Sequence, residues 1–262
     1  MKRKIKWSRV VLLLVVVLAL VSSGFFIWNR LFSDSLLDPA LFVNRQGIME
    51  YKDTRYISKI GIDVSDHQEE IDWKEVKKSG IQFAMIRCGY RGATEGKLHE
   101  DRMFHKNMQE AIAQGIDVGV YFYSTAINDK ELKEEIDFVL EQVKSYKITY
   151  PIAYDMETYY DGAGRIDVLN KEEKTDFALW FTKAMRKKGY DSLIYGNKHW
   201  LTNDLDIKRI QDQPIWYAAY QDIPELEMPF YMWQYTDSNQ VPGISTVVDM
   251  NIQIIKKEGN RK

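Results

Sequence analysis

Apolar runs of strand length alternate with amphipathic segments over most of this chain. From Lys59 onward, eight runs are rich in β-branched and aromatic residues, a composition typical of buried strands. They lie at residues 60–65, 83–89, 117–124, 151–157, 192–197, 215–220, 231–236 and 247–251. Three helical patterns lie between the early runs, at residues 100–115, 128–146 and 170–189.

Boundary residues support the three helical segments. The first ends on Gly115, and glycine is common just past the C-terminus of a helix. The second opens on Asn128, a capping residue that an acidic first turn follows. The third opens on Asn170 and ends with basic residues before Gly189.

This alternation of strands and helices predicts the α/β class, with a parallel sheet and helices outside it. Eight strands in about 200 residues indicate an irregular (β/α) TIM-like barrel, at the small end of the usual size range. The last three strands follow one another through short connections, so we expect few helices on them. The expected barrel covers residues 59–257.

The N-terminus predicts a transmembrane helix ahead of the barrel. Residues 1–9 carry five basic side chains and no acidic one, and the 19 residues of 10–28 carry no charge. About 20 apolar residues span a bilayer as a helix, and Trp7 and Trp28 flank the run where aromatic belts lie. We expect a cytoplasmic flank at 1–9, a membrane helix at 10–28 and a stalk at 29–58.

A cleaved signal peptide is the alternative reading of the same run, with the small residues at 21–24 as the cleavage site. The apolar stretch continues beyond those residues, and no A-x-A motif precedes Gly24. An uncleaved anchor is therefore favoured. In both readings everything after Trp28 lies outside the cell membrane, which gives a single-pass protein with an extracytoplasmic domain.

Charge and cysteine content exclude several classes of function. The chain has 36 basic and 38 acidic residues, and without the five basic residues of its start it has 31 against 38, a net charge of −7. Nucleic acids demand a basic surface, so we expect no nucleic-acid partner. Cys88 is the only cysteine, so the chain has no intramolecular disulfide and no cysteine cluster that could bind a metal. We expect Cys88 to be buried.

No metal or other cofactor is expected. His67 lies near Asp63 and Asp66 in sequence, but a solvated loop histidine explains it better than a metal site. The other three histidines have no paired spacing of the kind that metal-dependent deacetylases use: His99, His105 and His199.

Four acidic residues fall on three of the predicted strands: Asp63, Asp155, Glu157 and Asp249. Barrel enzymes build their active sites at the carboxyl ends of the strands, so we expect all four at one mouth, in a groove open at both ends. Asp155 and Glu157 are two apart and share one face of a strand. Buried like charges raise the pKa of a carboxyl, here most of all that of Glu157. A neutral acid beside a carboxylate suits cleavage of a glycosidic bond.

Four segments together resemble glycoside hydrolase family 25, the muramidases: residues 61–90, 150–160, 231–245 and 247–251. The resemblance implies a distorted barrel that cleaves the β-1,4 bond between N-acetylmuramic acid and N-acetylglucosamine in peptidoglycan of a bacterial wall. It also implies Glu157 as the general acid, with Asp63, Asp155 and Asp249 around the cleaved sugar. Many members have a lysine where this chain has Arg87, whose part in sugar binding is therefore open.

Two mechanisms are compatible with the acid pair. Direct attack by Asp155 needs two carboxyl groups ~5–5.5 Å apart across the bond. Residues two apart on a strand have Cα atoms ~6.6 Å apart and parallel side chains, so both acids lie on one side of the sugar. That placement favours a substrate-assisted path, in which the 2-acetamido oxygen attacks while Asp155 orients and stabilises it.

Aromatic and amide side chains on the same strands are candidates for sugar binding: Tyr121, Tyr123, Tyr195, Trp216, Tyr220, Trp233 and Gln234. Strand alternation turns about half of such residues toward the helices. Tyr121, Trp233 and Gln234 are the predicted substrate contacts, together with Arg87.

Two other functions stay open at this point. A chitinase-like barrel glycosidase also ends a strand with D-x-E, but it carries further aspartates where this chain has Tyr150 and Ala153. A membrane-tethered module that binds peptidoglycan without cutting it is the non-enzymatic reading. A turbidity assay on purified wall sacculi distinguishes the two, because only an enzyme lowers the turbidity.

Overall fold

A computed structural model describes residues 37–158, 164–226 and 228–257. The strands are β1 (Phe42–Arg45), β2 (Ile48–Tyr51), β3 (Tyr56–Val64), β4 (Phe83–Arg91), β5 (Leu98–Glu100), β6 (Asp117–Tyr123), β7 (Ile152–Asp155), β8 (Ser192–Asn197), β9 (Ile215–Ala218), β10 (Met232–Asn239) and β11 (Val248–Lys256). The α-helices are α2 (Trp73–Lys78), α3 (Phe104–Ala113), α4 (Asp129–Val143), α5 (Lys171–Lys187) and α6 (Ile207–Ile210). Short 3-10 turns at Pro39–Leu41, Asp66–Gln68 and Arg165–Val168 and a π-turn at Trp200–Asp204 complete the elements.

Eight strands close into a barrel, in the order β3-β11-β10-β9-β8-β7-β6-β4, through a further pairing of β3 with β4. Each of the eight predicted apolar runs corresponds to one of these strands, so that prediction is confirmed. The short β5 is added outside the ring, antiparallel to β4. From β3 through β4 to β10, neighbouring barrel strands run parallel.

The last strand runs the other way, which corrects the all-parallel sheet expected from the sequence. β11 is antiparallel to both of its neighbours, β10 and β3. A parallel return needs a crossover of a dozen or more residues, whereas only residues 240–247 separate β10 from β11. The short connection therefore forces the reversal.

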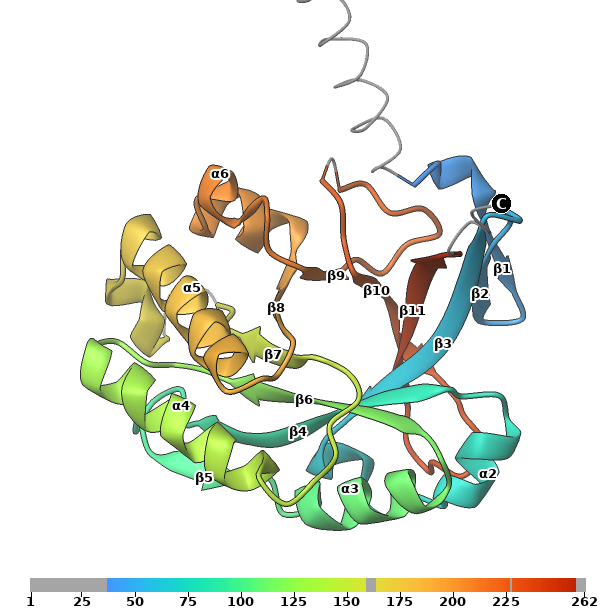
Figure 1. Ribbon diagram of the computed structural model, residues 1–262, viewed down its shortest axis with the longest axis horizontal. Coiled ribbons are helices and arrows are strands. Elements are labelled where there is room, and N and C mark those ends of the chain that lie inside the picture. Colours follow the sequence, from blue (N-terminus) through green and yellow to red (C-terminus); the bar gives the residue numbers. More distant parts are fainter. Residues whose placement is uncertain (1–36, 159–163, 227, 258–262) are drawn as a thin grey trace, which may run out of the picture. The chain divides into compact units, whose positions relative to one another are not determined.

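Helices α3, α4 and α5 confirm the three predicted helical segments and pack on the outside of the β4–β8 part of the sheet (Figure 1). Asn128 and Asn170 accept hydrogen bonds from backbone N–H groups in the first turns of α4 and α5, as their capping role predicts. No α-helix lies between β9 and β11 in the described residues. The expected scarcity of helices on the last strands is confirmed.

Strand alternation fills the barrel and fixes which side chains reach its mouth. On β7, Ala153 belongs to the interior cluster with Phe83 and Leu193, while Tyr154 faces outward and packs against Phe181 of α5. Asp155 has the same parity as Ala153 and so faces the interior. Gly61 allows the close packing, because a Cβ atom there would lie 2.4 Å from the Phe83 ring.

Residues 39–58, expected as part of a stalk, instead belong to the same compact unit as the barrel. The β1–β2 hairpin packs on the barrel through Phe42, whose ring meets that of Trp233 edge-on at 5.2 Å between centroids. Met49 of β2 is fully buried. The hairpin therefore buries apolar side chains against the barrel. In the sequence, the polar residues between these side chains obscure the pattern.

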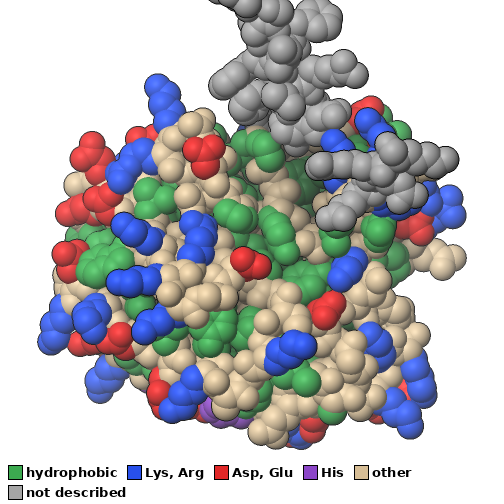
Figure 2. All heavy atoms as spheres, in the orientation of Figure 1, with side chains coloured by type: hydrophobic (Ala, Val, Ile, Leu, Met, Phe, Trp, Pro, Cys, Tyr) green, Lys and Arg blue, Asp and Glu red, His purple; other side chains and the backbone are tan. Residues whose placement is uncertain are grey.

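The expected transmembrane helix at 10–28 and the flank at 1–9 lie outside the described residues. Among the residues that the structure does describe, no helix combines the length and the apolar character that a membrane crossing requires. On the face shown in Figure 2, acidic and basic side chains are interspersed rather than gathered into one basic surface.

Replacing Phe42 by alanine should lower the free energy of unfolding by about 3 kcal/mol, because a buried aromatic contact is lost. Urea denaturation of the full chain measures the change. Val43 points to the other side of β1 and is only half-buried, so Val43→Ala is the matched control, with a loss of less than about 1 kcal/mol. Equal losses in the two variants would contradict the packing role of the hairpin.

Candidate active site

The four predicted acids lie at one mouth of the barrel and line a single cavity of about 840 Å³. Asp63 and Asp155 lie at the carboxyl ends of β3 and β7, and Glu157 follows two residues later. Asp249 lies at the start of β11, and because that strand is antiparallel its start is at the same rim. Asp63 and Asp249 are direct cross-strand partners. The predicted convergence is therefore confirmed.

Gln234 joins two of the acids on one wall of the cavity. Its Nε2 donates to Asp63 Oδ2 and to Asp249 Oδ2, at 2.9 Å in each case. Its Oε1 accepts from the Tyr195 hydroxyl at 2.8 Å and from the Tyr220 hydroxyl at 3.2 Å. These contacts fix the orientation of the amide and hold the two carboxyl groups together.

A second buried amide supports Asp63 from below. Asn251 Nδ2 donates to Asp63 Oδ2 at 2.7 Å, and Asn251 Oδ1 accepts from Trp216 Nε1 at 2.7 Å. Trp216 also lines the cavity, where its ring meets those of Tyr121 and Tyr195. This wall offers aromatic rings and amide groups, the usual partners of sugar rings and hydroxyls.

The Asp63–Asp249 pair holds at least one proton at neutral pH. Burial raises the pKa of Asp63 to about 6, although the hydrogen bonds from Asn251 and Gln234 oppose the shift. Burial and then the neighbouring Asp63 raise the pKa of Asp249 to about 9. A carboxylic acid on Asp249 can then share its proton with the Asp63 carboxylate.

Asp155 and Glu157 form the second pair. Burial raises the pKa of Glu157, as predicted. The predicted contribution from neighbouring negative charges acts on Asp155 instead. The pKa of Asp155 is raised well above its usual value by burial, then by Glu157 and Asp63, with Arg87 opposing. The Oδ1 atom of Asp155 is buried and has no hydrogen-bond partner in the described part of the chain. The pKa is therefore raised at both residues, whereas the sequence predicts the shift mainly for Glu157.

Arg87 lines the opposite wall of the cavity together with Tyr90 and His67. Its Nε donates to Asp101 at 2.8 Å and its Nη2 to Asp66 at 2.6 Å, and the guanidinium lies over the Tyr90 ring. Two aspartates hold Arg87 in place beside the acids. His67 is exposed, as expected for a loop histidine, and the described residues hold no group of three side chains suited to a metal.

Trp233 does not line the cavity, which corrects its prediction as a substrate contact. It is fully buried on the outer side of β10, under the β1–β2 hairpin, and its Nε1 donates to the Ala219 carbonyl at 2.9 Å. Gln234 follows it and has the opposite parity, which turns the amide inward. The other aromatic candidates line the cavity: Tyr121, Tyr123, Tyr195, Trp216 and Tyr220.

Asn251 is a site residue that the sequence reasoning missed. It is two residues after Asp249 in β11, so strand alternation puts both on one face of that strand. This spacing could have identified Asn251. The shared strand face predicted for Asp155 and Glu157 is not formed, because β7 ends at Asp155 and Glu157 lies beyond it. Cys88, by contrast, is fully buried as predicted, and burial raises the pKa of its thiol.

Asp249→Asn should make the fold more stable at alkaline pH. The folded state holds the Asp249 proton to a higher pH than the unfolded chain does, so stability is lost as pH rises from about 4 toward 9. Asparagine does not titrate and keeps the oxygen that accepts from Gln234. We expect a gain of about 1–3 kcal/mol in the free energy of unfolding at pH 8 and little change near pH 4. A variant that is equally destabilised at both pH values would contradict the assignment.

Comparisons with known proteins agree with this site. The model of the glycosyl hydrolases family 25 matches residues 62–244. The uncharacterized protein YegX of Escherichia coli O6:H1 is 30% identical over 199 residues, which cover 73% of this chain and 68% of YegX.

Solved structures are similar as well. The modular autolysin LytC from Streptococcus pneumoniae, determined in complex with a synthetic peptidoglycan ligand, is 27% identical with a TM-score of 0.68. The match covers 80% of this chain and 51% of the LytC chain, so this chain spans about half the length of that relative. The bacterial lysozyme from Streptomyces coelicolor is 25% identical with a TM-score of 0.64, over 76% of this chain and 92% of that one.

Proposed function

The chain belongs to glycosyl hydrolase family 25, and we propose that it is a peptidoglycan muramidase. In this proposal it cleaves the β-1,4 bond between N-acetylmuramic acid and N-acetylglucosamine. The observation that carries the proposal is the cavity at the mouth of the barrel, which Asp155 and Glu157 line together with Asp63 and Asp249 and where burial raises the pKa of both Asp155 and Glu157. The autolysin and lysozyme relatives support the choice of substrate.

Glu157 is the general acid of the proposed reaction. It gives its proton to the glycosidic oxygen while the bond between that oxygen and C1 breaks. The carbonyl oxygen of the sugar's own 2-acetamido group forms the new bond to C1 and gives a cyclic oxazolinium ion. Water then attacks C1 and the oxazolinium ring opens, which restores the acetamido group. The Glu157 carboxylate takes the proton from that water.

Asp155 supports the substrate-assisted path. Its buried Oδ1 has no partner among residues 37–158, 164–226 and 228–257, and the N–H of the acetamido group is a donor that can bind there. A hydrogen bond from that N–H favours the ionised form of Asp155, and the Asp155 charge in turn favours the protonated form of Glu157. The Asp155 charge then stabilises the positive oxazolinium. Glu157 follows two residues after Asp155, the last residue of β7, so we expect both acids to approach the sugar from one side, as this path requires.

The product of digestion tests the function. Purified full-length protein is incubated with wall sacculi, the released fragments are reduced with borohydride, and mass spectrometry identifies the reduced sugar. Reduced N-acetylmuramic acid is the expected product. Reduced N-acetylglucosamine would place the cleavage at the other bond, and binding to sacculi without any new reducing ends would support the non-catalytic module.

The membrane anchor is part of the same proposal and rests on the basic flank at 1–9 and the uncharged run at 10–28. Protease added to intact cells whose wall has been removed should digest the domain beyond about residue 59. A cytoplasmic protein of the same cells serves as the control. If the protease leaves it intact, the membrane is sealed. A domain that is protected, or that is released with an N-terminus near Gly24, would contradict the uncleaved anchor.

A further inference from the structure

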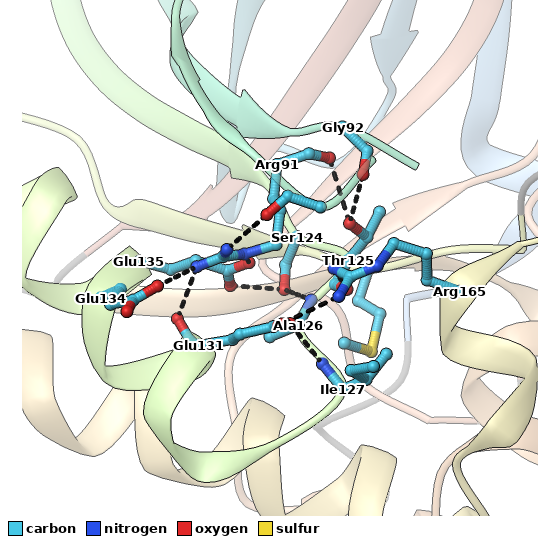
Figure 3. Close-up of polar contacts among 12 residues, drawn as sticks. Arg91, Gly92, Ser124, Thr125, Ala126, Ile127, Glu131, Glu134, Glu135 and Arg165 are labelled. Carbon is cyan, nitrogen blue, oxygen red and sulfur yellow. Dashed lines mark hydrogen bonds and ion pairs between the residues drawn. The ribbon is translucent and has the colours of Figure 1, made fainter. Parts of the chain in front are cut away.

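A buried network of charged and polar side chains lies between the end of β4 and helix α4 (Figure 3). Arg91, the last residue of β4, is 3% exposed. Its Nε donates to Glu135 Oε1 at 2.8 Å, its Nη1 to the Gly96 carbonyl at 2.7 Å and its Nη2 to the Glu131 carbonyl at 2.9 Å. Glu135 is fully buried. The guanidinium therefore joins the end of β4, the loop after it and α4.

The network continues to the strand that carries the catalytic acids. The second oxygen of Glu135 accepts from Ser124 Oγ at 2.6 Å, and Ser124 Oγ lies 3.1 Å from the Tyr154 hydroxyl. The backbone N–H of Ser124 donates to the Asp155 carbonyl at 2.7 Å. Glu135 thus reaches the backbone of Asp155 through Ser124 and through the outward-facing Tyr154 beside it.

The loops at the edge of the cavity are tied to the same network. Arg165 Nη2 donates to Glu131 Oε1 at 2.8 Å, and its Nη1 donates to the Thr125 carbonyl at 3.0 Å. Its backbone N–H donates to the carbonyl of Ala93, a residue that lines the cavity. Figure 3 shows Arg91 and Arg165 approaching the 124–127 segment from different elements.

Support for the backbone matters here because the Asp155 carboxyl group has little support of its own. Its Oδ1 has no hydrogen-bond partner among the residues that the structure describes. By contrast, Gln234 and Asn251 hold Asp63 directly. The position of Asp155 and Glu157 is therefore set by the end of β7. A displacement of about 1 Å in a reacting group can cost about 10²-fold in rate.

We propose that Arg91 and Glu135 are positioning residues, which hold the end of β7 so that Asp155 and Glu157 stand in reacting geometry. Neither side chain lines the cavity or touches substrate. The inference rests on the proposed muramidase function, because the geometry matters only if the acid pair cuts a glycosidic bond.

Two variants of the full chain separate positioning from stability. Glu135→Gln keeps the shape of the side chain but removes its charge, and Arg91→Met with Glu135→Leu replaces the buried ion pair by apolar groups. Such replacement is often neutral for stability or stabilising. We expect kcat on sacculi to fall about 10-fold or more in both, with KM within about twofold, because the aromatic wall is unchanged. Asp137→Asn is the control. It removes an exposed ion pair with Lys133 on the same helix and should leave kcat and KM unchanged.

A spectroscopic measurement makes the test independent of activity. In protein with ¹³C-labelled carboxyl groups, the titrations of Asp155 and Glu157 should shift in Glu135→Gln, while that of Asp53, whose pKa is lowered by Arg55 and Lys257 outside the cavity, stays in place. Unchanged titrations and an unchanged kcat in a folded Glu135→Gln protein would overturn the positioning role, as would a double variant that folds and keeps full kcat. If wild-type protein fails to cut sacculi, the muramidase proposal fails, and the titrations still report whether the network positions the pair.

Discussion

Glu157→Gln should lower the rate of sacculus cleavage by about 10²-fold or more, because the amide keeps the shape of the side chain but cannot donate the proton to the leaving oxygen. The group lies at the mouth of the barrel, and burial raises its pKa, which favours the protonated form that a general acid needs. The rate is measured from the loss of turbidity and from the release of reducing ends.

Glu141→Gln is the matched control for this variant. Glu141 lies on the exposed face of α4 and pairs there with Lys144, away from the cavity. Its replacement should leave the rate unchanged. Circular dichroism should show the wild-type fold in both proteins. Normal lysis by a folded Glu157→Gln protein would remove Glu157 from the role of acid.

Asp155→Asn should be impaired to a similar extent, about 10²–10³-fold, because the oxazolinium ion loses the charge that stabilises it. The same variant should be more stable than the wild type. The pKa of Asp155 is raised in the folded state, so the folded protein loses stability as pH rises above the unfolded value near 4. Asparagine removes that penalty, so the free energy of unfolding should be higher than that of the wild type at pH 7.

A lower cleavage rate together with a higher stability identifies a catalytic carboxylate. Loss of activity through misfolding would lower the melting temperature together with the rate. Thermal unfolding at pH 4 and pH 7, measured beside kcat, separates the cases. An Asp155→Asn protein that is active, or one that is destabilised at pH 7, would contradict the role given to Asp155.

The strands, the main helices and the convergence of the acids could be predicted because their signals are local. Apolar runs have strand length, Asn128 and Asn170 cap helices, and the carboxyl ends of parallel strands share one rim. The direction of β11 has no local signal. It follows from the length of the connection before it and from pairing with β3, which is far away in the sequence.

The errors about single residues have a common physical cause. Alternation divides a strand into two faces, but it does not say which face meets the interior or what covers the other. Trp233 was assigned to the mouth because the sequence gives no sign that the β1–β2 hairpin folds back over the outer side of β10. That hairpin was itself read as a stalk, since its strands have only four residues each and mix apolar with polar positions.

The pairing of β11 with β3 also sets when during its synthesis the protein becomes an enzyme. Asp63 and Asp249 face each other across the seam where the first and last barrel strands meet, from Asp249 opposite Asp63 to Lys256 opposite Tyr56. A contact between residues so distant in sequence forms late, after the intervening chain is made. A chain still emerging from the ribosome therefore lacks part of its site. The hydrolase stays inactive until barrel closure, so its cutting activity begins only with a completely folded domain.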